Sequence, residues 1–105
     1  MQADEPYKEI VITGDYKNFN DFYEDNKLNV YKSIVETFNG FRDIKNEQLI
    51  LRVVSKLKKF EWETEFIFDR NNYEILKRDI LPFFEKIEDY ETCQEINQLH
   101  NLLTI

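Results

Sequence analysis

The most regular stretch of the sequence is Phe60-Glu61-Trp62-Glu63-Thr64-Glu65-Phe66-Ile67-Phe68, in which two kinds of side chain alternate. Four aromatic residues and Thr64 take the even positions, while three glutamates and Ile67 take the odd positions. Successive side chains of a β-strand point to opposite faces of a sheet, so this alternation predicts a strand over residues 60–68. Its aromatic face is expected to pack on the core and its carboxylate face to lie in water, as is common in antiparallel sheets.

A second, shorter strand is predicted over residues 8–13. The β-branched run Ile10-Val11-Ile12 has polar neighbours on both sides, and Gly14-Asp15 then supplies a turn signal. Residues 1–6 are polar and end in Pro6, which indicates a short flexible arm before this strand.

Between the two predicted strands, apolar residues recur at steps of three and four, which predicts a helix over residues 20–39. Its buried stripe is expected to hold Leu28, Tyr31, Ile34, Val35 and Phe38. Asp21 followed by Glu24 has the spacing of a capping pair at the start of the helix. Asn39-Gly40 is expected to end it, with Gly40 in the left-handed conformation.

Residues 46–59 fit two structures. Leu49-Ile50-Leu51 and Val53-Val54 are compatible with a strand, but Ile50, Val53, Val54 and Leu57 also follow a helical step. Arg52, Ser55, Lys56, Lys58 and Lys59 would then occupy the opposite face, and no Gly or Asn offers a hairpin turn before Trp62. We therefore predict a helix over 46–59 and keep the strand as the alternative.

The C-terminal third is predicted to form two helices, over residues 73–87 and 90–103, that pack as a hairpin. Asn72 and Asp89 are the expected N-caps. Pro82 lies inside the first helix, so a kink or restart is expected near Asp79 to Pro82. The apolar stripe of the second helix holds Cys93, Ile96, Leu99 and Leu103. The whole chain 1–105 is thus predicted to be one helix-rich α+β domain.

Composition restricts the classes of function. The chain has 14 Lys plus Arg against 21 Asp plus Glu, a net charge of −7, which disfavours binding to nucleic acid or to an anionic membrane. No window is apolar enough to span a membrane and the N-terminus is polar, so a cytoplasmic location is expected. Frequent Lys, Asn, Ile and Glu with scarce Ala and Gly suggest an AT-rich genome, as in a low-GC bacterium or its phage.

No constellation for catalysis or metal binding is recognisable in the sequence. His100 is the only histidine and lacks a triad or ligand pattern around it, and Cys93 has acidic neighbours that would raise rather than lower its thiol pKa. Gly14 and Gly40 are the only glycines, which rules out a glycine-rich phosphate loop. Arg52 with Lys56, Lys58 and Lys59 could touch phosphate, but a solvated face is the simpler interpretation. We therefore expect no enzyme activity, no cofactor and no metal.

One segment carries a family resemblance. Phe84-Glu85-Lys86-Ile87-Glu88-Asp89-Tyr90-Glu91-Thr92-Cys93-Gln94-Glu95-Ile96 resembles the start of the UVR-type helical hairpin of excision-repair subunits and Clp-associated adaptors. The second helix of that hairpin opens with an aromatic-Glu pair and small residues. The Arg-Asp pair of the family is replaced here by Asn97-Gln98, and the match covers about the last fifth of the chain. The resemblance implies a module for protein-protein contact.

The sequence therefore favours a non-enzymatic, acidic protein-binding domain of the inhibitor, immunity protein, antitoxin or adaptor type, with a partner that has a basic surface. The residues expected to contact this partner are carboxylates in two groups: Glu61, Glu63 and Glu65 on the predicted strand, and Glu85, Glu88, Asp89 and Glu91 near the predicted hairpin turn. The glutamates of the strand could hold a divalent cation only with further oxygen ligands. The alternative function is a self-associating structural subunit of a bacterial or phage complex, a homodimer for example, because few strands leave exposed sheet edges.

Overall fold

The computed structural model describes residues 8–16, 18–42, 48–57 and 61–104. The predicted arm at residues 1–6 lies outside these residues, as do Lys58, Lys59 and Phe60. No helix in the described ranges is both long and apolar enough to cross a membrane.

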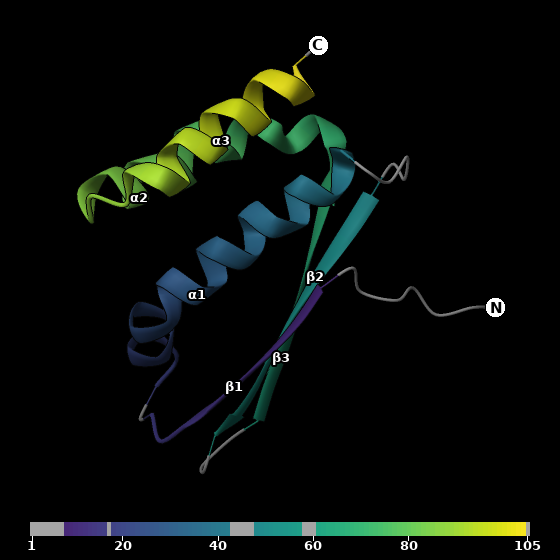
Figure 1. Cartoon of the computed structure of the whole chain (residues 1–105). Coiled ribbons are helices and arrows are strands. Elements are labelled where there is room, and N and C mark those ends of the chain that lie inside the picture. Colours follow the sequence, from purple (N-terminus) through teal and green to yellow (C-terminus); the bar gives the residue numbers. More distant parts are fainter. Residues whose placement is uncertain (1–7, 17, 43–47, 58–60, 105) are drawn as a thin grey trace, which may run out of the picture.

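The fold is α+β, with a three-stranded sheet in the order β1-β2-β3 (Figure 1). β1 (Lys8–Gly14) pairs in parallel with β2 (Gln48–Leu57), and β2 pairs antiparallel with β3 (Glu61–Asp69). The register places Val54 of β2 between Val11 of β1 and Glu63 of β3. The strands predicted over 8–13 and 60–68 are thus confirmed, each within one residue at its ends.

The predicted helix over 46–59 is wrong, because residues 48–57 form the central strand β2. Four alternate side chains of β2 are buried under the helices: Leu49, Leu51, Val53 and Ser55. A central strand has hydrogen-bonded neighbours on both sides and is covered on at least one face, so it can be nearly continuous in apolar residues. When apolar residues occupy both faces of a strand, the sequence shows no two-residue alternation, and the same residues can also match a helical spacing of three and four.

α1 (Phe19–Asn39) confirms the helix predicted over 20–39, but its buried face and its ends differ. Of the predicted stripe, Ile34, Val35 and Phe38 are buried as predicted, Tyr31 is partly buried and Leu28 is 40% exposed. Phe22 and Val30 are buried in addition. The N-cap is Asn18, whose Oδ1 accepts from the backbone N–H of Asp21 at 2.9 Å, instead of Asp21 itself. Gly40 has φ −61°, and the chain continues through a short 3-10 turn, so the predicted left-handed cap is wrong.

The C-terminal third forms the predicted hairpin through α2 (Leu81–Lys86) and α3 (Tyr90–Leu103). Leu76–Ile80 is a π-helical segment, and Pro82 stands in the first turn of α2, where its missing N–H costs least. The irregularity predicted near Asp79 to Pro82 thus takes the form of this π-helical segment, after which α2 begins. Asn72 does not cap a long helix but accepts from the N–H of Asp69 at the start of a 3-10 turn, Arg70–Tyr73.

The connection from α2 to α3 is a tight turn. Glu88 has φ 61°, the left-handed conformation that glycine usually supplies after a helix, and Asp89 donates its N–H to the carbonyl of Phe84 at 3.0 Å. The Asp89 carboxylate then caps α3 by accepting from the N–H of Thr92, as predicted. The predicted stripe of Cys93, Ile96, Leu99 and Leu103 is buried.

All three labelled helices lie on one side of the sheet, with α1 between the strands and the α2–α3 hairpin (Figure 1). One core cluster connects these layers, running from Leu51 and Phe68 of the sheet through Phe38 of α1 to Phe84 and Ile96 of the hairpin. Among the described residues no helix covers the other face of the sheet, and that asymmetry positions the candidate site.

Candidate functional site

The uncovered side of the sheet, called the open face below, is built from the strand positions that alternate with the core. It consists of Glu9, Val11 and Thr13 of β1, of Ile50, Arg52, Val54 and Lys56 of β2, and of Glu61, Glu63, Glu65 and Ile67 of β3. Two of its apolar members are prominently exposed, Val11 at 52% and Ile67 at 57%. The open face is therefore a mixed surface of branched aliphatics and charged groups.

Arg52 is the centre of the open face and binds carboxylates from both neighbouring strands. Its Nη2 lies 2.7 Å and its Nε 3.1 Å from Oε2 of Glu65, its Nε lies 3.3 Å from Oε1 of Glu63, and its Nη1 lies 3.4 Å from Oε2 of Glu9. The hydrogen bonds to Glu65 and the charges of Glu65, Glu63 and Glu9 raise the pKa of the guanidinium above its ordinary value. The arginine thus ties the three strands together on their solvent side.

The carboxylates of the open face outnumber its cations. Among the described residues of the open face, four are carboxylates, Glu9, Glu61, Glu63 and Glu65, and two are cations, Arg52 and Lys56. This surplus agrees in sign with the net charge of −7 on the whole chain. A field of this sign attracts a basic protein and repels an acidic one.

The seven predicted contact residues do not form one site. Glu61, Glu63 and Glu65 share the open face on β3, whereas Glu85, Glu88, Asp89 and Glu91 lie around the α2–α3 turn, which Figure 1 shows far from the strands. Asp89 is engaged in capping, and its hydrogen bonds to Thr92 lower its carboxyl pKa. Its Oδ2 also lies 4.0 Å from Nζ of Lys32. Both regions add exposed apolar side chains to their charge, Val11 and Ile67 on the open face and Ile87 and Tyr90 near the turn. The open face is the more ordered surface, since three hydrogen-bonded strands hold its side chains in one register.

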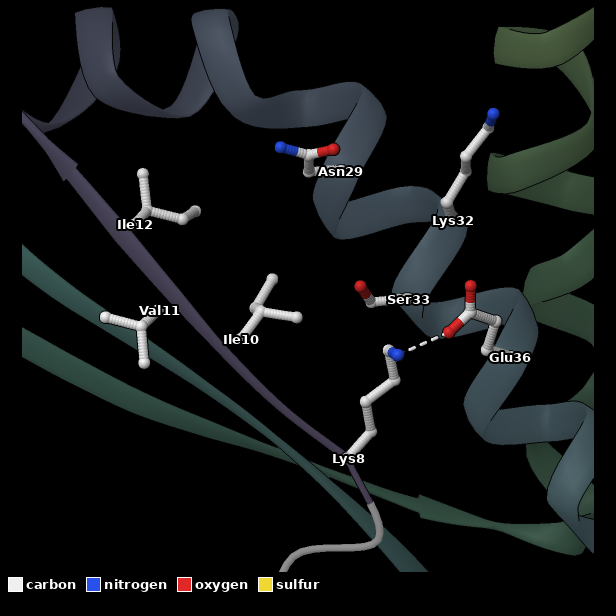
Figure 2. Close-up of a pocket in the computed structure, with 8 residues that line it drawn as sticks. All are labelled: Lys8, Ile10, Val11, Ile12, Asn29, Lys32, Ser33 and Glu36. Carbon is white, nitrogen blue, oxygen red and sulfur yellow. Dashed lines mark ion pairs between the residues drawn. The ribbon is translucent and has the colours of Figure 1, made fainter.

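A groove of about 380 Å³ runs beside the open face, between β1 and α1 (Figure 2). Ile10 and Ile12 point toward α1, Val11 points to the other side of the strand, and Ser33 faces them from the helix. Lys8 closes one end through an ion pair with Glu36 at 2.5 Å. The groove therefore follows the outer edge of β1 and has an apolar floor.

A larger groove, about 530 Å³, lies between α1 and α2 and is filled in part by the chain itself. The Lys27 ammonium lies 5.5 Å from the ring centroid of Tyr31, 5.8 Å from that of Phe83 and 5.9 Å from that of Tyr23. Such distances allow cation–π attraction. Burial and the hydrogen bond from its hydroxyl to that of Tyr31 raise the pKa of Tyr23 to about 12. The groove thus holds a lysine of the chain against its aromatic wall.

Cys93 and His100, the two residues considered for catalysis, both pack within the fold. Cys93 is buried, as predicted, and desolvation together with the charges of Glu85 and Asp89 raises its thiol pKa, so the thiolate nucleophile is disfavoured. Burial lowers the pKa of His100, which packs edge-on against the ring of Tyr73. In the described part of the chain, no three His, Cys, Asp or Glu residues are placed to hold a metal ion together.

Sequence reasoning assigns Arg52, together with Ile50, Val54 and Lys56 of the same surface, to a helix instead of a strand. The strand β2 overturns the interpretation of Arg52 as part of the basic face of a helix with Lys56, Lys58 and Lys59. The signal that would have found its role was the strand alternative for 46–59. In that alternative Arg52 and the glutamates of residues 61–65 belong to adjacent strands and can lie side by side.

Searches against known protein families, curated proteins and solved structures return no match for this chain, so its function has to be argued from the geometry above.

Proposed function

We propose that this chain is a non-enzymatic protein-binding domain and that the open face of its sheet contacts a partner with a basic surface. The observation that carries the proposal is the combination of exposed Val11 and Ile67 with a surplus of carboxylates on one uncovered sheet face. Apolar side chains supply the area that a protein contact buries, and the carboxylates steer a basic protein to it.

The placement of the charges supports different roles for the three strand glutamates. Glu63 and Glu65 are held by Arg52, so each would have to rearrange before it could bind a partner cation. Glu61 stands across from Lys56 in the strand register and lies at the opposite end of β3 from Ile67. Glu61 and Ile67 therefore mark the two ends of the surface on β3 and are the best positions for testing it.

The test is affinity capture at low salt from a lysate of cells that naturally produce the protein. The bait is compared with an open-face variant, Glu61→Lys with Ile67→Lys. The matched control is Glu95→Lys with Leu102→Lys on α3, which makes the same change in charge and also replaces an exposed aliphatic side chain. Captured proteins are identified and quantified by mass spectrometry.

We expect a basic protein to be retained by the wild type and the control and to be lost by at least about tenfold from the open-face variant, because like charges oppose association and apolar area is lost. The purified partner should then associate more slowly as salt rises. A partner retained equally by the open-face variant would contradict the assignment of this surface.

A second candidate function is self-association, which the edge strands favour. Within the described residues β1 and β3 each pair with β2 alone, so one side of each backbone has no strand partner there. An unpaired edge is a template for another strand. This function would agree with a structural subunit of a larger complex.

A further inference from the structure

We propose that the β1 edge binds the β1 edge of a second copy of this chain, antiparallel and across a twofold axis at Val11, so that two sheets become one. This inference deepens the candidate function of self-association and does not rest on binding of a basic partner. Its basis is the self-complementarity of the strand Lys8-Glu9-Ile10-Val11-Ile12-Thr13-Gly14.

A register centred on Val11 pairs every residue of β1. It sets Val11 opposite the Val11 of the second copy, Ile10 opposite Ile12, Glu9 opposite Thr13, and Lys8 opposite Gly14. β-branched residues directly across from one another stabilise antiparallel strands, and like charges in that position destabilise them. This register brings together three β-branched pairs and no pair of like charges.

Neighbouring registers fit less well. A register centred on Ile10 sets Lys8 opposite Ile12 and Glu9 opposite Val11, so charged and apolar groups face each other and two residues lose their partners. A register centred on Ile12 sets Val11 opposite Thr13 and Ile10 opposite Gly14, and it leaves Lys8 and Glu9 without partners in β1. The number of paired residues therefore selects Val11 as the centre, and the chemistry of the pairs also disfavours the register centred on Ile10.

The β3 edge of the sheet is protected against the same kind of strand pairing. The solvent side of β3 carries Glu61, Glu63 and Glu65 in succession, and antiparallel self-pairing within this run sets carboxylate against carboxylate. Charged side chains on an edge strand are a common device against unwanted pairing. β1 lacks such a run, and its central exposed residue is the aliphatic Val11.

The groove beside β1 fits a strand that adds to this edge. Ile10 and Ile12 point into the groove, and Figure 2 shows Val11 on the opposite side of the strand. In the proposed pair, Ile10 and Ile12 of each copy meet on the groove side, while the two Val11 side chains meet on the open face. Because the twofold axis is perpendicular to the sheet, both open faces lie on the same side of the dimer.

The experiment is sedimentation velocity of the purified full chain, without any other protein, over a concentration series up to about 1 mM, where even a dissociation constant of about 1 mM leaves much dimer. The variants are Val11→Lys and, as the matched control, Ile67→Lys. Both replace an exposed aliphatic residue of the open face by the same cation, but Ile67 lies on β3. Circular dichroism verifies that each variant is folded.

We expect a dimer for the wild type and for Ile67→Lys, and dimerisation weakened about tenfold or more for Val11→Lys, whose two lysines would face each other. An equimolar mixture of Val11→Lys with Val11→Glu should restore the dimer as a mixed species, which a merely destabilised strand would not do. If Val11→Lys is unfolded, Val11→Cys is used in its place. This variant should form a disulfide-linked dimer under mild oxidation, since only a register in which Val11 faces Val11 brings the two thiols together.

A wild type that stays monomeric throughout the series overturns this inference together with self-association. If Val11→Lys dimerises as strongly as the wild type and mixing it with Val11→Glu has no effect, the β1 interface is wrong, although self-association itself is supported. Neither outcome affects the capture experiment with Glu61 and Ile67, because that experiment measures binding of another protein and changes residues of β3, not of β1.

Discussion

His100 shows how one side chain makes the stability of the fold depend on pH. Its Nδ1 is buried and has no hydrogen-bond partner among the described residues. Desolvation lowers its pKa from the ordinary 6.5, nearby Lys77 lowers it further, and Glu74 acts in the opposite direction. The neutral imidazole is therefore the form that the folded chain prefers.

We predict that acid weakens the fold through this residue before it affects the carboxylates. In the unfolded chain His100 binds a proton near pH 6.5, and in the folded chain it does so only at lower pH, so unfolding takes up protons as pH falls below 6.5. Stability is then lost on going from pH 7 to pH 5. In His100→Phe, which keeps a ring against Tyr73, this loss should be smaller, as measured by urea unfolding at each pH.

The pH window of this effect separates it from that of Asp89. The Asp89 pKa is lowered from 3.8, so its stabilising contribution is present above that pH and is lost only as pH falls through the lower folded value. Equal slopes for the wild type and His100→Phe between pH 7 and pH 5 would show that His100 is not the group responsible.

At the scale of the strands, Arg52 offsets the repulsion among Glu9, Glu63 and Glu65. We predict that Arg52→Met, which keeps an apolar stem, lowers the melting temperature, and that the decrease is greater at low salt than at about 1 M salt, where screening acts within roughly 3 Å. The control is Arg78→Met. Arg78 pairs with its neighbour Asp79 at 2.9 Å and links no separate elements, so a much smaller change is expected.

Equal decreases for the two arginine variants would contradict a special role of Arg52. So would a decrease for Arg52→Met that does not depend on salt, since that result would indicate lost packing instead of unbalanced charge. Differential scanning calorimetry at both salt concentrations provides the measurement.

The strands also show what the sequence could predict. The alternation over 60–68 reveals which face of β3 is wet, because its glutamates are exposed and Phe68 is buried. β2 lacks a comparable contrast, since Ile50 and Val54 on its open side are as apolar as Leu51 and Val53 on its core side. The preference for a strand there comes from pairing with β1 and β3, which are distant in sequence, and local periodicity does not contain that information.

At the scale of the whole molecule, the candidate site depends on topology. Charge alone predicts that the carboxylates of 61–65 and those of 85–91 contact the same partner. α1 and the strands place them apart (Figure 1), and Arg52 neutralises part of the first group. The edge position of β1 follows from the strand order, which no single segment of the chain determines.

The continuous core predicts that sheet and helical hairpin unfold together. One buried cluster contains Leu51 and Phe68 of the sheet together with Phe84, Cys93, Ile96 and Leu99 of the hairpin. Because α3 has no separate core, it should unfold neither before nor after the sheet. Cys93 is the only cysteine of the chain and is buried in α3, which makes it a specific reporter of the hairpin. Pulses of a thiol reagent along a urea series measure its exposure.

We expect the midpoint of Cys93 labelling to coincide with the midpoint of the far-ultraviolet circular dichroism transition, which reports on the whole chain. In the folded protein burial and the charges of Glu85 and Asp89 keep the thiol protonated and slow to react, so the contrast with the unfolded chain is large. Labelling that precedes the loss of ellipticity would mean that the hairpin opens before the sheet. The α2–α3 layer would then be a separate cooperative unit, and the prediction that it unfolds together with α1 and the sheet would be wrong.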